Sequence, residues 1–152
     1  MDLKFRVFAY IGKPVHEVFE AVADPDQLSH YFTTGGARGR LEQGATVTWD
    51  FHDFPGTFPV FVTEAVPDER IVLQWKADEQ GEDVPEYRTT VTMTFKATDD
   101  GRTLVEIAEE GWRETPAGLQ ASYDNCMGWS QMLAALKMWV EHGINLREGM
   151  YK

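Results

Sequence analysis

The sequence predicts an α+β domain with two layers, in which a curved antiparallel sheet is covered on one face by a long C-terminal helix. From residue 38 to residue 112, apolar and polar residues alternate in successive short runs, which is the period of half-buried strands. From Leu119 to Leu146, apolar residues instead recur every three and four positions, the period of one helical face. A series of strands followed by a helix, rather than strands alternating with helices, is typical of this class.

Length, charge and cysteine content limit the possible functions. The chain has 152 residues, so we expect one domain over residues 1–152. A formal net charge of -11 argues against nucleic acid or an anionic membrane as a partner, since both are polyanions. Residues 1–11 lack the features of a signal peptide, and no apolar run reaches membrane-spanning length, so we expect a cytoplasmic protein without membrane insertion. The single cysteine, Cys126, excludes an intrachain disulfide.

The N-terminal part predicts one strand and two short helices. Over Leu3–Ile11, apolar Leu3, Phe5 and Val7 alternate with Lys4 and Arg6, which indicates a half-buried strand. The first helix has an apolar side formed by Val15, Val18, Phe19 and Val22. Asp24 is suited to cap the second helix, because Pro25 follows it in the first turn, and the residues Thr33–Gly36 end that helix.

About six further antiparallel strands are predicted before the long helix. The clearest of these strands cover Val47–Phe51, Phe58–Val66, Ile71–Trp75 and Tyr87–Phe95, and the last strand has Val105, Ile107 and Glu109 on one face. The segments between them are predicted as turns at Pro55-Gly56, Val66–Glu69 and Asp99–Gly101 and as a loop over Asp78–Pro85. The long helix then buries a stripe formed by Cys126, Trp129, Leu133, Leu136 and Val140, in which Cys126 is an inert core thiol.

Four segments resemble one known family. They are Pro14–Phe19 followed by Asp24-Pro25, the strand-turn-strand run Val62–Trp75, the strand ending Glu110-Gly111-Trp112, and Gly128-Trp129 through Leu136 in the long helix. Together they resemble the activator-of-heat-shock-ATPase-like family of the START-like, SRPBCC superfamily, and the similarity covers essentially the whole chain. The resemblance implies the helix-grip fold, also seen in birch-pollen-allergen-like proteins, with an elongated apolar cavity between sheet and helix. The family's name also implies contact with a chaperone in the stress response.

The sequence contains no recognisable catalytic or metal-binding motif. The chain lacks the GxSxG, Walker and GxGxxG patterns, and its histidines have no second ligand at the spacing of an HExxH site. His52 lies between Asp50 and Asp53, but strand alternation places Asp50 and His52 on the solvent face. We therefore expect no metal and no cofactor, and we favour a binding protein over an enzyme.

Alternation places the acidic residue Glu109 beside Val105 and Ile107 on the concave face, beneath the long helix. A buried carboxylate without a partner is unfavourable, so the side chain must be paired, protonated or directed into a polar pocket. Three alternatives are open: a half-exposed position at the strand end, an ion pair with Arg88 or Arg113, or a role in a ligand pocket.

Large rings suggest a cavity for a small molecule. Ligand pockets are mostly apolar and contain a few polar groups that orient the ligand, here Thr89, Glu109 and Tyr123. The predicted ligand-binding residues are Trp49, Phe51, Trp75, Tyr87, Thr89, Val91, Glu109, Trp112, Tyr123, Met127 and Trp129. We expect an apolar or aromatic ligand such as a lipid, polyketide or flavonoid-like compound, bound by a monomer or homodimer. The alternatives are a chaperone-interacting protein and an aromatase/cyclase or hydrolase-type enzyme on the same fold.

Overall fold

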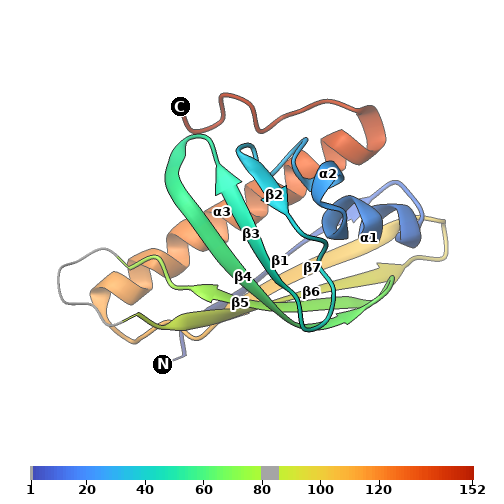
Figure 1. Cartoon of the computed structure of the whole chain (residues 1–152). Helices are drawn as coiled ribbons and strands as arrows, with labels where there is room; N and C mark the ends of the chain where they lie inside the picture. The colour runs from blue at the N-terminus through green and yellow to red at the C-terminus, as the bar shows by residue number, and fades with distance from the viewer. Residues whose placement is uncertain (1, 80–85) are drawn as a thin grey trace.

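Seven antiparallel strands form one curved sheet, and a long C-terminal helix lies across its concave side (Figure 1). The computed structural model describes residues 2–79 and 86–152, so most of the loop predicted over 78–85 lies outside the described residues. The strand order is β1-β7-β6-β5-β4-β3-β2. The strands are β1 (Lys4–Ile11), β2 (Gly36–Arg38), β3 (Thr46–Phe51), β4 (Phe54–Val66), β5 (Arg70–Lys76), β6 (Arg88–Ala97) and β7 (Thr103–Glu110). The helix-grip fold predicted from the sequence is confirmed.

Strand alternation correctly predicted which side chains of the central strands face the helix. On β6 and β7 every second residue is buried, and Val91, Met93, Val105 and Ile107 belong to one core cluster. Glu109 shares this inward face, opposite Val91 on β6 and Phe5 on β1. The register therefore places a carboxyl group at the end of an otherwise apolar row.

The turn between β3 and β4 differs from the prediction. It consists of His52 and Asp53, while Gly56, which was predicted to form the turn, lies within β4. The β3–β4 register shifts between Asp50 and Phe51, and Gly56 has a φ of 95°, a left-handed conformation that favours glycine. Gly56 therefore marks an irregularity inside a strand rather than its beginning.

The three helices are α1 (Val15–Ala23), α2 (Pro25–Leu28) and α3 (Pro116–His142). Asp24 caps α2 as predicted, since its side chain accepts a hydrogen bond from the Asp26 backbone. The α3 helix begins and ends earlier than the predicted Leu119–Leu146. Thr115 caps its N-terminus, and Gly143, at φ 69°, ends it in the left-handed conformation. The chain after Gly143 turns back toward the β3–β4 hairpin (Figure 1).

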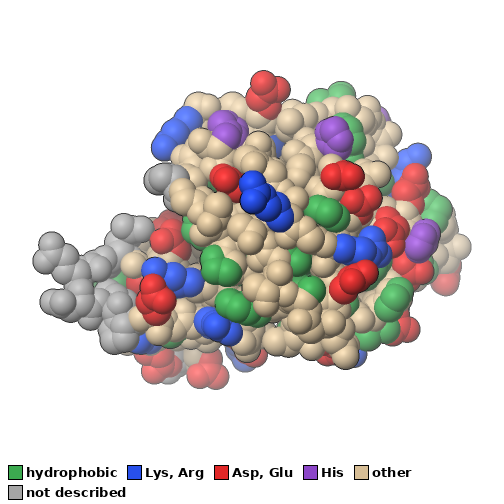
Figure 2. All heavy atoms as spheres, viewed as in Figure 1, with side chains coloured by type: hydrophobic (Ala, Val, Ile, Leu, Met, Phe, Trp, Pro, Cys, Tyr) green, Lys and Arg blue, Asp and Glu red, His purple; other side chains and the backbone are tan. Residues whose placement is uncertain are grey.

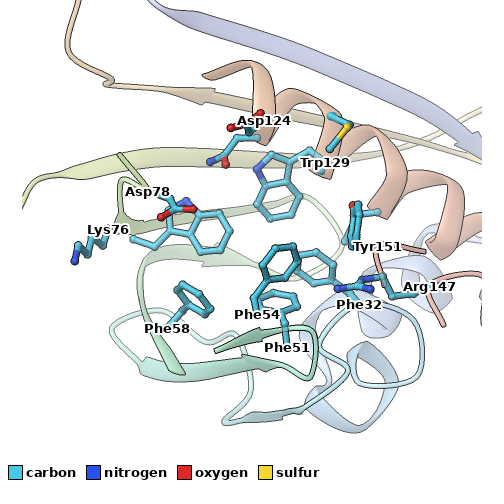
Figure 3. A pocket seen from close by; sticks show the side chains of 15 residues that line it. Phe32, Phe51, Phe54, Phe58, Lys76, Asp78, Asp124, Trp129, Arg147 and Tyr151 are labelled. Atoms are coloured by element: carbon cyan, nitrogen blue, oxygen red, sulfur yellow. The ribbon is translucent and has the colours of Figure 1, made fainter. Parts of the chain in front are cut away.

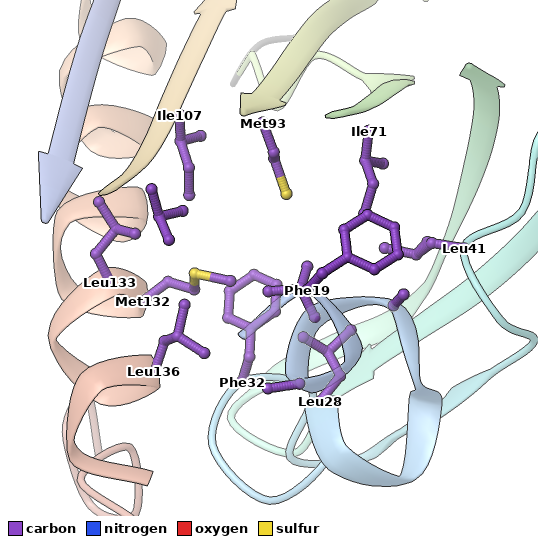
Figure 4. Packing of buried hydrophobic residues seen from close by; sticks show 14 of the residues in the cluster. Phe19, Leu28, Phe32, Leu41, Ile71, Met93, Ile107, Met132, Leu133 and Leu136 are labelled. Carbon is purple, nitrogen blue, oxygen red and sulfur yellow. The ribbon is translucent and has the colours of Figure 1, made fainter. Parts of the chain in front are cut away.

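The middle of the predicted helical stripe is buried, and its two ends are not. Trp129, Leu133 and Leu136 are at most 2% exposed, whereas Cys126 and Val140 are only half-buried. Figure 4 shows Leu133 and Leu136 facing side chains from the sheet and from the two short helices. On the face shown in Figure 2, charged side chains of both signs are scattered among single apolar ones, so the apolar mass of this fold lies inside.

Leu136→Ala is expected to lower the free energy of unfolding by at least about 2 kcal/mol, because Leu136 is fully buried and its loss leaves a void. The measurement is urea unfolding. Leu119→Ala on the same helix is the matched control, since Leu119 is 38% exposed and should lose less than about 1 kcal/mol. Equal losses in the two variants would contradict the assignment of the buried face.

Candidate functional site

Glu109 lies at the centre of a polar cluster inside the apolar interior. The side chain is 1% exposed, and it accepts hydrogen bonds from two strands and from α3. Its Oε1 accepts from Trp129 Nε1 at 2.8 Å and from Asn125 Nδ2 at 3.0 Å. Its Oε2 accepts from Thr89 Oγ1 at 2.6 Å, Trp75 Nε1 at 3.0 Å and Asn125 Nδ2 at 3.1 Å. These contacts satisfy both carboxyl oxygens with donors from the protein.

The donors around Glu109 are all neutral, so neither predicted arginine partner pairs with it. Arg88 instead lies over the Phe61 ring at 3.7 Å, and Arg113 lies over the Tyr87 ring at 4.4 Å. Burial raises the pKa of Glu109 above its ordinary value, and the hydrogen bonds that it accepts act in the opposite direction. Indole and amide N–H groups can only donate, so the cluster is arranged to hold an ionised carboxylate.

The raised pKa predicts how stability depends on pH. Between the ordinary value of 4.5 and the raised pKa of Glu109, the folded chain keeps a proton that the unfolded chain has released. We therefore expect the free energy of unfolding of the wild type, relative to Glu109→Gln, to fall as the pH rises from the ordinary pKa of 4.5 toward the raised pKa of Glu109. Urea unfolding at a series of pH values measures this difference. A difference that is constant or increases with pH would contradict the prediction.

A pocket of about 330 Å³ opens next to this cluster, between the first half of α3, the ends of β3, β4 and β5, and the C-terminal segment. Figure 3 shows Phe32, Phe51, Phe54 and Phe58 grouped on one side of it and Trp129 on the other. The full lining is Phe32, Phe51, Phe54, Phe58, Trp75, Lys76, Asp78, Asp124, Asn125, Met127, Gly128, Trp129, Met132, Arg147 and Tyr151. Most of these side chains are aromatic or methionine, and the charged ones come mainly from strand ends and the helix surface.

The structure brings four of the predicted site residues to this pocket. They are Phe51, Trp75, Met127 and Trp129. Trp49 is buried in the core behind it, where its ring lies 5.6 Å from Trp75 and 6.5 Å from Trp129. Glu109 and Thr89 do not line the pocket, although Glu109 binds three residues that do. Val91 is fully buried in the core.

Three predicted residues lie elsewhere. Tyr123 is 61% exposed and does not line the pocket, so its ring does not face the ligand site as its predicted role requires, although Met127, one helical turn later, does line it. Trp112 packs in a separate cluster and stacks on Phe5 at 5.5 Å. Tyr87 packs against that cluster, and its hydroxyl donates to Glu79. Alternation indicates the side of a strand correctly, but it does not indicate which end of a long interface a ring occupies.

The sequence analysis missed an ion pair that forms one end of the pocket. Arg147 donates two hydrogen bonds to Asp53 in the β3–β4 turn, each of 2.7 Å, and both side chains are at most 5% exposed. The Arg147 guanidinium holds the pKa of Asp53 below its ordinary value. The sequence analysis placed Asp50 and His52 on the solvent face and made no assignment for Asp53, which the structure buries. His52 is exposed as expected, and its Nδ1 lies 2.6 Å from the Thr34 hydroxyl.

Tyr151 and Asn125 are two further pocket residues that the sequence analysis did not identify. Tyr151 packs its ring against Phe54 at 5.7 Å, so the C-terminal segment forms a wall of the pocket. Asn125 had a recognisable signal, because it precedes Trp129 by four positions and such residues share one side of a helix. Residues 2–79 and 86–152 contain no group of three side chains suited to hold a metal, and no helix among them is long and apolar enough to cross a membrane.

A sequence model of one family covers most of this architecture. The family described as activator of Hsp90 ATPase homolog 1-like protein matches residues 13–141, which run from the start of α1 to the end of α3. The chain belongs to this family. The resemblance noted in the sequence is therefore confirmed. No curated protein sequence matches this family member.

Solved structures share the fold of this family member at low sequence identity. Protein MLL2253 from Mesorhizobium loti is similar with a TM-score of 0.77 and 20% identity, over 93% of this chain and 98% of that one. The Aha1 dimer from Colwellia psychrerythraea gives a TM-score of 0.74 and 20% identity, over 92% and 97%. DynU16, a putative protein in the dynemicin biosynthetic locus, gives a TM-score of 0.80 and 22% identity, over 97% of this chain and 50% of that one. At this identity the likeness concerns the fold alone.

Proposed function

We propose that this family member binds an apolar or aromatic small molecule, such as a lipid, polyketide or flavonoid-like compound, in the pocket between α3 and the β3–β4 hairpin. The pocket is the observation that carries the proposal. Its volume of about 330 Å³ falls in the range of ligand sites, and its wall of rings and methionines with few polar groups has their usual composition.

The ring contacts support a pocket that exists before the ligand arrives. Trp129 lies 5.5 Å from Trp75 and 5.4 Å from Phe32, and Phe51 lies 5.7 Å from Phe58, with distances between ring centroids. Both tryptophans are also fixed by their hydrogen bonds to Glu109. Side chains held in this way lose little conformational entropy on binding, which favours affinity.

Binding is favoured over catalysis because of the position of Glu109. A general acid or base must reach the substrate within hydrogen-bond distance. Glu109 is the buried acid of this region, but it is absent from the pocket wall and both its oxygens already accept hydrogen bonds from the protein. The buried Asp53 is likewise engaged by Arg147.

Native mass spectrometry of the freshly purified protein tests the proposal. A small molecule of defined mass that remains bound to the folded chain, and is released on unfolding, is the expected result. A variant with a blocked pocket separates binding at this site from binding elsewhere.

Gly128→Phe is expected to weaken binding at least about tenfold, because Gly128 lines the pocket and open space surrounds the position of its missing Cβ. Gly128→Ala is the matched control, which should bind as the wild type does and gain about 0.5–1 kcal/mol of stability from better helix propensity. Titration of the co-purified compound, or of a substitute aromatic compound, measures both. Unchanged binding in Gly128→Phe would place the ligand outside this pocket.

A further inference from the structure

The two tryptophans of the pocket turn their N–H groups away from it. Trp75 Nε1 and Trp129 Nε1 both donate to Glu109, and Glu109 does not line the pocket. The N–H lies on the positive edge of an indole, while the faces of the ring are negative. The half-buried Trp75 therefore offers a ligand ring surface whose positive edge is already engaged, and the buried Trp129, 2% exposed, packs against it at 5.5 Å between ring centroids.

A carboxylate without a cationic partner stands directly behind these rings. The printed donors to Glu109 are the neutral side chains of Trp75, Thr89, Asn125 and Trp129, and no ion pair to it occurs among the described residues. The side chain is 1% exposed, so water screens its charge weakly. Its field therefore reaches the pocket through the two indoles.

The two cations of the pocket lining already have acidic partners. Arg147 pairs with Asp53, and the exposed Lys76 lies 3.1 Å from Glu86. A carboxylate also lies on the pocket wall, since Asp124 is part of its lining. The groups around the pocket thus give it a negative rather than a positive field.

The other end of the pocket shows its rings in contact with cations of the chain itself. The Arg147 guanidinium lies 4.4 Å from the centre of the Tyr151 ring, and the Lys152 ammonium lies 5.8 Å from that of Phe54. Both distances are within the range of cation–π attraction. Cations of the chain therefore lie over rings at that end. Among the described residues, no Lys or Arg side chain lies over the ring of Trp75 or Trp129.

We infer that the pocket selects an organic cation that carries an aromatic ring system, such as a quaternary aromatic ammonium compound. Its positive centre lies against Trp75, near the carboxyl group of Glu109, and its apolar part extends toward Phe51. This inference rests on the proposed binding function and names the charge of the ligand. Desolvated cation–π contacts with tryptophan are the strongest of their kind, and a buried carboxylate behind the ring adds to the attraction.

The test compares two probes of the same shape, 1-methylquinolinium and 1-methylnaphthalene, by isothermal titration. The first is a cation and the second is its neutral counterpart with the same number of electrons. A purely apolar pocket prefers the neutral probe, because it is the more hydrophobic. We expect the cation to bind about tenfold more tightly, and to keep most of this advantage in high salt, because attraction to surface charge is screened there and attraction to buried charge is not.

Variants then locate the origin of the preference. Glu109→Gln should bring the ratio of the two dissociation constants close to one, and Trp75→Leu should do the same without altering the carboxylate. Glu106→Gln is the control: it removes a charge from the outer face of the same strand and should leave the ratio unchanged. Binding of the neutral probe reports in each variant that the pocket is still formed.

The possible outcomes separate this inference from the function on which it rests. If the neutral probe binds as tightly as the cation, and Gly128→Phe abolishes its binding, the preference for a cation is refuted and the proposed function stands. If the advantage of the cation survives in both Glu109→Gln and Trp75→Leu, the inference is likewise refuted. If neither probe binds the wild type, both proposals fail.

Discussion

Glu109→Leu is expected to lower the free energy of unfolding by about 3–5 kcal/mol, although it replaces a buried acid by an apolar side chain of similar size. The change removes the acceptor of every donor in the cluster. Thr89 and Trp129 are fully buried, so their donors then have neither a protein partner nor water, and each unsatisfied group costs about 1–3 kcal/mol. Removal of the desolvated carboxylate offsets part of this loss, because burying that charge is itself unfavourable.

The measurement is urea unfolding at neutral pH. Two further variants are compared with Glu109→Leu. Glu109→Gln keeps one acceptor oxygen and should lose less than Glu109→Leu, about 1–3 kcal/mol. Glu106→Leu on the outer face of β7 is the matched control and should change stability by no more than about 0.5 kcal/mol. If Glu109→Leu proves as stable as the wild type, the tryptophans do not depend on the carboxylate for their position.

Arg147→Met should lower the free energy of unfolding by about 3–5 kcal/mol, because it leaves Asp53 buried without its partner. The same change releases the C-terminal segment, since Arg147 is the residue that joins this segment to the β3–β4 turn through two hydrogen bonds. Hydrogen exchange of residues 143–152 should increase in the variant. If the segment loosens, water reaches the Asp53 carboxylate and reduces the cost of its unpaired charge. Full hydrogen exchange of residues 143–152 would therefore go with a loss of stability near the lower end of the range of about 3–5 kcal/mol.

The double variant Arg147→Met, Asp53→Leu should recover part of the lost stability, because it removes the unpaired charge together with its partner. Arg102→Met is the matched control, since Arg102 pairs with Asp100 on the surface, where water and salt screen the attraction, and its loss should be much smaller than that of Arg147→Met. Losses that simply add in the double variant would contradict a direct interaction between Asp53 and Arg147.

Features that depend on local periodicity could be predicted from the sequence. The spacing of Trp129, Leu133 and Leu136 gave the buried side of α3, and alternation along β7 gave the inward position of Glu109. Asp24 and Pro25 gave the start of α2, because capping involves only neighbouring residues. The fold followed from these elements and from the family resemblance.

Features that depend on contacts between distant segments could not be predicted. Asp53 and Arg147 are 94 positions apart, and nothing near either residue indicates the other. The β3–β4 turn lies at Asp53, three residues before the glycine that was expected to form it. The donors of Glu109 come from β5, β6 and α3, so only the completed fold distinguishes them from the two arginines that seemed available in the sequence.

The pairing of β1 with β7 has a consequence for how the chain folds as it leaves the ribosome. Strands β3 to β7 follow one another as hairpins, whereas β1, made first, has β7 as its strand partner, and Ile11 pairs with Thr103. Translation adds about 5–20 residues per second, so β1 waits several seconds for its neighbour. During that time its exposed backbone and its apolar side chains Phe5 and Val7 are open to mispairing with other chains. Synthesis of β7 and α3, rather than of the first hairpins, therefore ends the interval in which a nascent chain is prone to aggregate.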